Sequence, residues 1–201
     1  MFSERRVDLP DGRSIRYLEA GGGTALVHLQ EDLRVTPAHD LLARRFRVMV
    51  FETPAPDAVG PSGLATALGR LGVDAFNLMG TSRAGTAALS LALHAPERIL
   101  ALVLESPTAI DPDRRDAATD ERLSSVAVPT LVLFGTTDDV VPPEAGRVYK
   151  ALIPNGHLVF VYAAGHSVGA DRPEAFAEVA TDFLERHEAF VISRAATLIH
   201  P

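Results

Sequence analysis

Short apolar runs alternate along the chain with segments whose apolar residues recur at helical spacing. The runs are too short for membrane spans and match strands buried on both faces of a sheet. We predict such strands at residues 25–29, 46–51, 75–79, 99–104, 130–134 and 158–162. We predict helices at residues 38–45, 63–71, 144–152 and 173–187, and one that begins just after Ser82 and ends by Pro96. This alternation indicates an α/β fold with a doubly wound, mostly parallel sheet flanked by helices on both faces.

Both ends of the chain depart from this alternation. Residues 6–9 and 14–19 flank the turn sequence Pro10-Asp11-Gly12 and are expected to form a β-hairpin. We expect a single domain over residues 1–187 and a C-terminal extension over 188–201. The apolar stretch 190–199 either covers exposed core, serves a homodimer contact or is a partly ordered tail.

Composition narrows the classes of partner. The 201 residues carry a formal charge of −7, so neither nucleic acid nor an anionic membrane is expected as a partner. The absence of cysteine excludes disulfides and a cysteine nucleophile. The charged amino terminus lacks the apolar core of a signal peptide, and we expect a cytoplasmic protein that acts on a small molecule.

The most informative segment is Gly80-Thr81-Ser82-Arg83-Ala84-Gly85, which joins a predicted strand to a predicted helix. Small residues on both sides of Ser82 permit a sharp strand-to-helix turn. Such a turn lifts the serine oxygen out of the sheet and makes the amide of Arg83 available to an oxyanion. We therefore predict Ser82 as a nucleophile, with one departure from Gly-x-Ser-x-Gly, because Ala84 stands where the second glycine is usual.

Topology ranks the candidates for the other catalytic roles, because ligands meet the carboxyl ends of parallel strands. His166 follows the strand 158–162 and lies at that edge, and we predict it as the general base. The remaining histidines considered, which lie before a strand or on or beyond a helix end, are His94, His157, His187 and His200. Asp138 follows the strand 130–134 and is the predicted acid, with Asp139 and Glu105 as alternatives.

The chain resembles the α/β-hydrolase fold family over roughly residues 5–187. The serine turn, Gly135-x-x-Asp138 with Pro142, and Gly165-His166 before Arg172-Pro173-Glu174 carry this resemblance, in the order Ser82, Asp138, His166. The family spacing between glycine and acid favours Asp138 over Asp139.

The resemblance also implies a second oxyanion donor, and this chain departs from the family pattern at the segment that would supply it. Family members usually carry His-Gly-x after the third strand, and the amide of x binds the oxyanion. Here the segment is His28-Leu29-Gln30, so Gln30 takes the position of x while Leu29 replaces the glycine. Either the backbone amide or the side chain of Gln30 would then donate.

Many relatives insert a helical cap between the sixth and seventh strands. Residues 107–128 are all that join them here, and they are rich in aspartate and arginine. We expect one exposed helix or loop in this segment, no sizeable cap and an open, shallow site.

Together these features predict a serine hydrolase that acts on a small ester or related acyl substrate through an acyl-enzyme. Perhydrolase, lactonase and carbon–carbon bond hydrolase activities use the same residues and stay open. No cofactor or metal ion is expected, since the histidines show no metal-ligand spacing. The alternative is a non-catalytic α/β-hydrolase-like protein that binds a small molecule or a partner.

Overall fold

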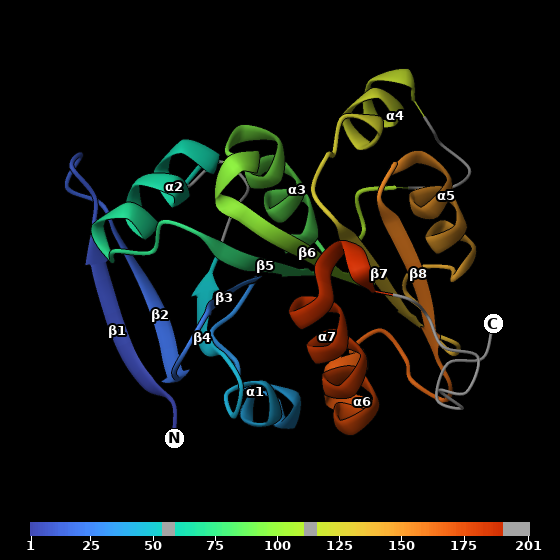
Figure 1. Ribbon diagram of the computed structural model, residues 1–201, viewed down its shortest axis with the longest axis horizontal. Helices are drawn as coiled ribbons and strands as arrows, with labels where there is room; N and C mark the ends of the chain where they lie inside the picture. The colour runs from blue at the N-terminus through green and yellow to red at the C-terminus, as the bar shows by residue number, and fades with distance from the viewer. Residues whose placement is uncertain (54–58, 111–115, 191–201) are drawn as a thin grey trace.

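A single sheet of eight strands runs through the molecule (Figure 1). The computed structural model describes residues 1–53, 59–110 and 116–190. The strand order is β1-β2-β4-β3-β5-β6-β7-β8, and all neighbours from β4 to β8 run parallel. The strands are β1 Ser3–Asp8, β2 Ser14–Gly21, β3 Ala25–Gln30, β4 Arg47–Glu52, β5 Phe76–Thr81, β6 Ile99–Glu105, β7 Thr130–Gly135 and β8 Gly156–Val161. The predicted doubly wound, mostly parallel sheet is confirmed.

Helices cover both faces of the sheet (Figure 1). One layer holds α1 Pro37–Leu42, α6 Val168–Asp171 and α7 Pro173–Arg186. The other holds α2 Pro61–Arg70, α3 Ala84–His94, α4 Ala117–Ser124 and α5 Glu144–Leu152. Short 3₁₀ turns follow α3 at Pro96–Arg98 and α7 at His187–Ala189.

The apolar strands are buried on both faces, as their sequences predict. Every residue of β3 and of β7 is buried. Leu78 belongs to the core under α3, whereas its neighbour Met79 belongs to the core under α7. Because successive side chains point to opposite faces, one continuous apolar run supplies both cores.

The amino-terminal hairpin forms as predicted, with strands longer than the pattern indicates. β1 pairs antiparallel with β2, and β2 pairs antiparallel with β4. At the turn between β1 and β2, Gly12 has a φ of 85°, a conformation that glycine adopts at no steric cost.

Two helices differ most from the sequence prediction. α1 ends at Leu42 instead of Arg45, because the amides of Arg44 and Arg45 donate to carbonyls three residues back and turn the chain toward β4. α6 was not predicted at all. It has 4 residues, too few to show a helical period.

The segment between β6 and β7 carries no sizeable cap in its described part, as expected. It forms α4, of whose residues only Leu123 is buried. Two other contacts tie the segment to the body of the fold: the Tyr149 hydroxyl donates to the Pro107 carbonyl at 3.2 Å and accepts from the Ile110 amide at 3.1 Å. Residues 111–115 lie outside the described ranges.

The division into residues 1–187 and 188–201 stays a prediction, because most of the proposed extension lies outside the described residues. Phe190, where the description ends, is buried and packs edge-on against Phe183 with ring centroids 5.3 Å apart. Over the described ranges, none of the helices is both long and apolar enough to cross a bilayer.

Candidate active site

Ser82 sits at the sharp turn between β5 and α3. Its φ of 53° lies in the left-handed region, which a residue with a side chain enters at a cost. A hydrogen bond of 2.9 Å from the Ser82 amide to the Glu105 carbonyl holds this conformation. The predicted strand–serine–helix turn is thus present, and it places Ser82 at the carboxyl end of β5.

The small residues around Ser82 are required by close approach of the backbone. A Cβ on Gly80 would lie 2.6 Å from the Cβ of Ala88 and 2.9 Å from the Cα of Gly85. Neither distance is tolerated, so the helix can begin directly behind the strand only with glycine here. Ala84 occupies the usual second glycine position and is accommodated as a buried residue.

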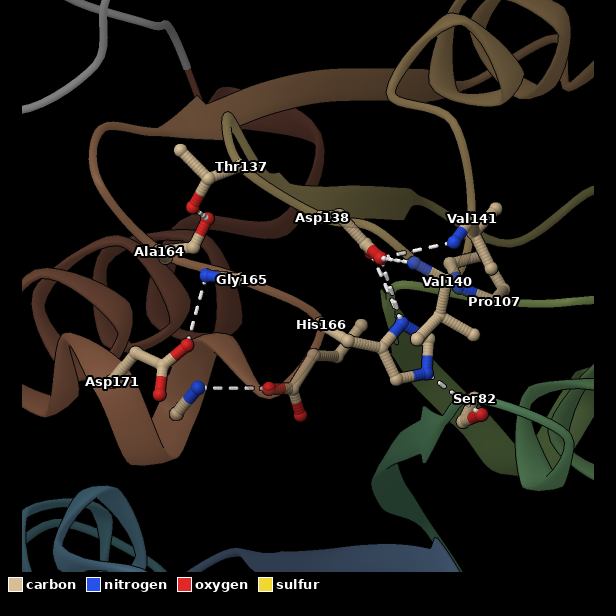
Figure 2. Close-up of polar contacts among 12 residues, drawn as sticks. Ser82, Pro107, Thr137, Asp138, Val140, Val141, Ala164, Gly165, His166 and Asp171 are labelled. Carbon is tan, nitrogen blue, oxygen red and sulfur yellow. Dashed lines mark hydrogen bonds and ion pairs between the residues drawn. The ribbon is translucent and has the colours of Figure 1, made fainter.

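The structure brings His166 and Asp138 to Ser82 (Figure 2). His166 Nε2 lies 3.0 Å from Ser82 Oγ. His166 Nδ1 lies 3.0 Å from Asp138 Oδ2 and 3.1 Å from Oδ1. A carboxylate only accepts hydrogen bonds, so we assign the imidazole proton to Nδ1, which leaves Nε2 free to accept from the serine hydroxyl.

The Asp138 carboxylate is itself fixed by the turn after β7. Oδ1 accepts the amide of Val140 at 3.0 Å and the amide of Val141 at 2.9 Å. The Asp138 side chain has no exposed area, whereas 20% of the His166 side chain is exposed. The imidazole is therefore accessible while its partner is enclosed and immobilised.

The two alternative acids are placed differently. Asp139 is exposed. Glu105 is buried, and its carboxylate accepts from the Thr81 hydroxyl and from the Gly169 amide, both at 2.8 Å, not from His166. Among the three candidate acids, Asp138 alone is hydrogen-bonded to the histidine.

Three of the other histidines considered, which the structure describes, do not join this group. His94 ends α3 and His157 lies near the start of β8, both away from the carboxyl ends of the strands. His187 follows α7, and His200 lies outside the described residues.

The side chain of Gln30 is turned away from Ser82. Its Nε2 donates to the Arg34 carbonyl at 3.0 Å, and 7% of the residue is exposed. Leu29, which replaces the usual glycine, is fully buried in the core under α3. The Gln30 side chain is thus engaged by the Arg34 carbonyl, and its backbone pairs with β4 opposite Glu52.

The two segments expected to supply oxyanion donors are linked to each other. The guanidinium of Arg83 pairs with the carboxylate of Glu31, directly after Gln30. Arg83 is also the residue that precedes the first turn of α3, where backbone amides lack acceptors inside the helix. The ion pair therefore joins the end of β3 to the start of α3.

Two small hollows flank the start of α3. One, of about 170 Å³, is lined by residues that include Glu31, Leu64 and Arg83. The other, of about 150 Å³, lies between α3 and α4 and is lined by residues that include Leu89 and Leu123. Thr86, one turn beyond Ser82, lines both hollows.

The site contains no evident metal-binding arrangement. Within the described ranges, no group of three or more histidine, aspartate or glutamate side chains is suitably placed to hold a metal ion.

Sequence reasoning missed His39 and Thr81. Both lie on a buried chain of polar side chains beneath the serine turn, together with His28 and Glu105. No local spacing marks such a chain, since its members come from separate strands and a helix. The signal that could have found it is the presence of polar residues inside otherwise apolar runs.

Residues 105–189 match the family model described as TAP-like protein, a stretch that includes Asp138 and His166. Among curated proteins, the chain is 35% identical over 65 residues to an uncharacterized hydrolase, YugF, of Bacillus subtilis, covering 32% of this chain and 24% of that protein. It is 33% identical over 63 residues to the pimeloyl-[acyl-carrier protein] methyl ester esterase of Neisseria meningitidis, covering 31% of this chain and 24% of that protein. These alignments thus span about a quarter of each relative.

Solved structures match over nearly the whole chain. A serine hydrolase involved in carbazole degradation, the CarC enzyme, superposes with a TM-score of 0.76 at 21% identity, covering 92% of this chain and 99% of that one. Carboxylesterase CesB of Bacillus subtilis gives a TM-score of 0.75 at 17% identity and covers 92% of each chain. With the sheet order, these matches show that the chain has the α/β-hydrolase fold.

Proposed function

We propose that the protein is a serine hydrolase that cleaves a small ester or related acyl substrate through an acyl-enzyme. The observation that carries this proposal is the continuous hydrogen-bonded series from Ser82 through His166 to Asp138. A nucleophile, a base within reach of it and a group that orients the base are the parts that acyl transfer needs. The curated relatives named above, a hydrolase and an esterase, support the same reaction class.

In the proposed mechanism, Ser82 Oγ attacks the acyl carbon while His166 Nε2 takes the hydroxyl proton. Asp138 holds the Nδ1 proton and compensates the charge of the imidazolium. The amides of Arg83 and Gln30 bind the oxyanion, and His166 returns its proton to the leaving group. A water activated by His166 then releases the acyl group and regenerates Ser82.

The small hollows beside Thr86 bear on substrate size. Pockets for drug-sized ligands usually measure about 300–1,000 Å³, whereas these hold about 170 and 150 Å³. We propose that short acyl groups fit and that discrimination among them is weak. A series of p-nitrophenyl esters of increasing acyl length tests this, and strong selectivity for one bulky ester would contradict it.

Labelling by a fluorophosphonate probe tests the proposed function, because the probe reacts with an activated serine. The wild-type protein is expected to take up one equivalent and Ser82→Ala none. Ser90→Ala is the matched control. Ser90 lies two turns along α3, and its hydroxyl donates to the Thr86 carbonyl instead of contacting His166. Removing this hydroxyl is therefore expected to leave labelling intact. An unlabelled wild-type protein would instead support the non-catalytic binding protein.

Replacing Gln30 by alanine separates its backbone from its side chain. We expect stability to fall by about 1 kcal/mol, because the bond to the Arg34 carbonyl is lost. We expect kcat to change less than about 3-fold, since losing a true oxyanion donor costs roughly 10²–10³-fold. Urea unfolding and ester kinetics measure the two effects. A hundred-fold loss of kcat in the folded variant would assign the donor to the side chain.

A further inference from the structure

A chain of polar side chains, all buried except the half-buried Thr81, runs beneath the serine turn on the face of the sheet covered by α1 and α7. His39 Nε2 lies 2.8 Å from His28 Nδ1, and His28 Nε2 lies 2.7 Å from the Thr81 hydroxyl. Thr81 in turn donates to Glu105 Oε2 at 2.8 Å. The chain reaches from α1 across β3 and β5 to the end of β6, and a cavity of about 30 Å³ adjoins it.

The hydrogen bond between Thr36 and His39 sets the direction of every other hydrogen bond in this series of polar side chains. The backbone N–H of Thr36 donates to His39 Nδ1 at 2.9 Å, and a backbone N–H cannot accept. Neutral His39 therefore carries its proton on Nε2 and donates to His28. Gln30 Nε2 also lies 3.4 Å from His39 Nε2, but it is a donor held by the Arg34 carbonyl at 3.0 Å, so this longer contact is not a hydrogen bond in this tautomer. His28 must then carry its own proton on Nε2 and donate to Thr81. Burial is the main cause that lowers the pKa of His39 to about 4 and that of His28 well below its usual value, so both rings are neutral.

Glu105 is the acceptor on which this series ends. Its Oε2 accepts from Thr81, and its Oε1 accepts from the Gly169 amide at 2.8 Å. Burial, the largest effect, raises the pKa of Glu105 above its usual value, although these two hydrogen bonds lower it in part. Two donors aimed at one carboxyl group match the ionised form, which only accepts.

Glu105 also contacts both the serine turn and the segment that follows His166. Its side chain holds Thr81, directly before Ser82, and Gly169, three residues after His166. Its backbone carbonyl accepts the Ser82 amide at 2.9 Å. A positive charge on His166 lowers the pKa of Glu105, a smaller effect than burial and the two hydrogen bonds. No ion pair from lysine or arginine to Glu105 occurs within the described ranges.

Resting on the proposed function, we infer that Glu105 is a positioning residue for the reaction. As a buried carboxylate, it fixes the serine turn against the His166 loop and favours the imidazolium that forms during acyl transfer. The other ionisable groups around this pair are Asp138 after β7, Asp171 at the end of α6, His28 on β3 and His39 on α1.

Glu105→Gln tests the charge while it keeps the shape. The variant is expected to lose roughly 10-fold in kcat, with KM changed less than about 2-fold, because Glu105 does not touch substrate. The acid limb of the pH–rate profile moves to lower pH by roughly one unit, since a lost negative charge makes the histidine harder to protonate. An unmoved acid limb would overturn the inference, because glutamine mimics a glutamate that was already neutral.

Asp171→Asn is the matched control. Asp171 accepts the Gly165 amide at 2.8 Å, next to His166, but it is exposed and its charge is screened by solvent. Its removal perturbs the same loop and is expected to leave the acid limb in place. An equal shift in both variants would attribute the effect to the loop and not to the buried charge.

A measurement independent of activity keeps this inference separable from the proposed function. Nitrogen NMR of the histidine rings in the wild-type protein is expected to show both His28 and His39 protonated on Nε2 at neutral pH. Either ring protonated on Nδ1 would break the series that ends on Glu105 and overturn the inference. Should Glu105→Gln fail to fold, the hydrogen bond from Thr81 to Glu105 is tested from the other side by comparing Thr81→Val with Thr81→Ser. Valine removes the hydroxyl and is expected to lower kcat, whereas serine keeps the hydroxyl and is expected to retain kcat. Equal activity in the two variants would contradict the positioning role of Glu105.

Discussion

Replacing Asp138 by asparagine is expected to lower kcat by about 10⁴-fold with little loss of stability. The effect follows from the way the carboxylate is held. Oδ1 accepts the amides of Val140 and Val141, while Oδ2 faces His166 Nδ1. Asparagine can satisfy the two amides only with its oxygen in the Oδ1 position.

That orientation turns the amide nitrogen of Asn toward His166. Two donors cannot face each other, and the oxygen that lies 3.1 Å from Nδ1 already accepts two amides, so the imidazole proton moves from Nδ1 to Nε2. Nε2 then points a proton at Ser82, 3.0 Å away, and cannot take the serine proton. The geometry is preserved while the base is lost.

Steady-state kinetics on a short p-nitrophenyl ester measure this effect. Asp139→Asn is the matched control, because Asp139 is the adjacent carboxylate and is exposed. We expect its kcat to stay within about 2-fold of wild type, as surface substitutions usually do little. An Asp138→Asn protein within 10-fold of wild type, or an Asp139→Asn protein as impaired, would refute Asp138 as the acid.

The sequence predicts the sheet well, because each parallel strand is an apolar run with no competing period. The helix 144–152 is predicted with its observed bounds, since its apolar residues recur at helical spacing. Predictions fail where local geometry decides. α1 ends early because its last amides form tight turns, and α6 is too short for any period to appear.

Topology and the serine-turn motif predict the candidate site, and the resemblance to the α/β-hydrolase family separates Asp138 from Asp139. Ser82, Asp138 and His166 each follow a strand, and parallel strands bring their carboxyl ends to one edge of the sheet. The sequence allows Glu105 as an alternative acid partner of His166. Only the structure shows that its carboxylate accepts from Thr81 and Gly169 instead. The side chain of Gln30 likewise required coordinates, since the rotamer of one residue at a strand end carries no sequence signal.

Gly135→Ala is the second substitution for which a large effect is expected, on stability and activity together. A Cβ on Gly135 would overlap the carbonyl oxygens of Ala164 and Gly165, the residues that lead into His166. These atoms cannot yield cheaply, because the Ala164 carbonyl also accepts from the amide of Thr137 at 2.9 Å and from its hydroxyl at 2.8 Å (Figure 2). Overpacking of this kind costs about 1–3 kcal/mol.

The displaced loop carries His166 with it, and a shift of about 1 Å at a catalytic group can cost roughly 10²-fold in rate. Thermal unfolding should show Tm lowered by roughly 2–4 °C for each kcal/mol lost, and ester kinetics should show the loss of kcat in the folded fraction. Gly69→Ala is the control, since a Cβ there meets nothing within 4 Å and alanine favours the helix α2. A Gly135→Ala protein as stable and as active as wild type would mean that the loop before His166 can move without disturbing its bond to Ser82. Reduced stability with unchanged kcat would separate the packing role of Gly135 from the placement of the base.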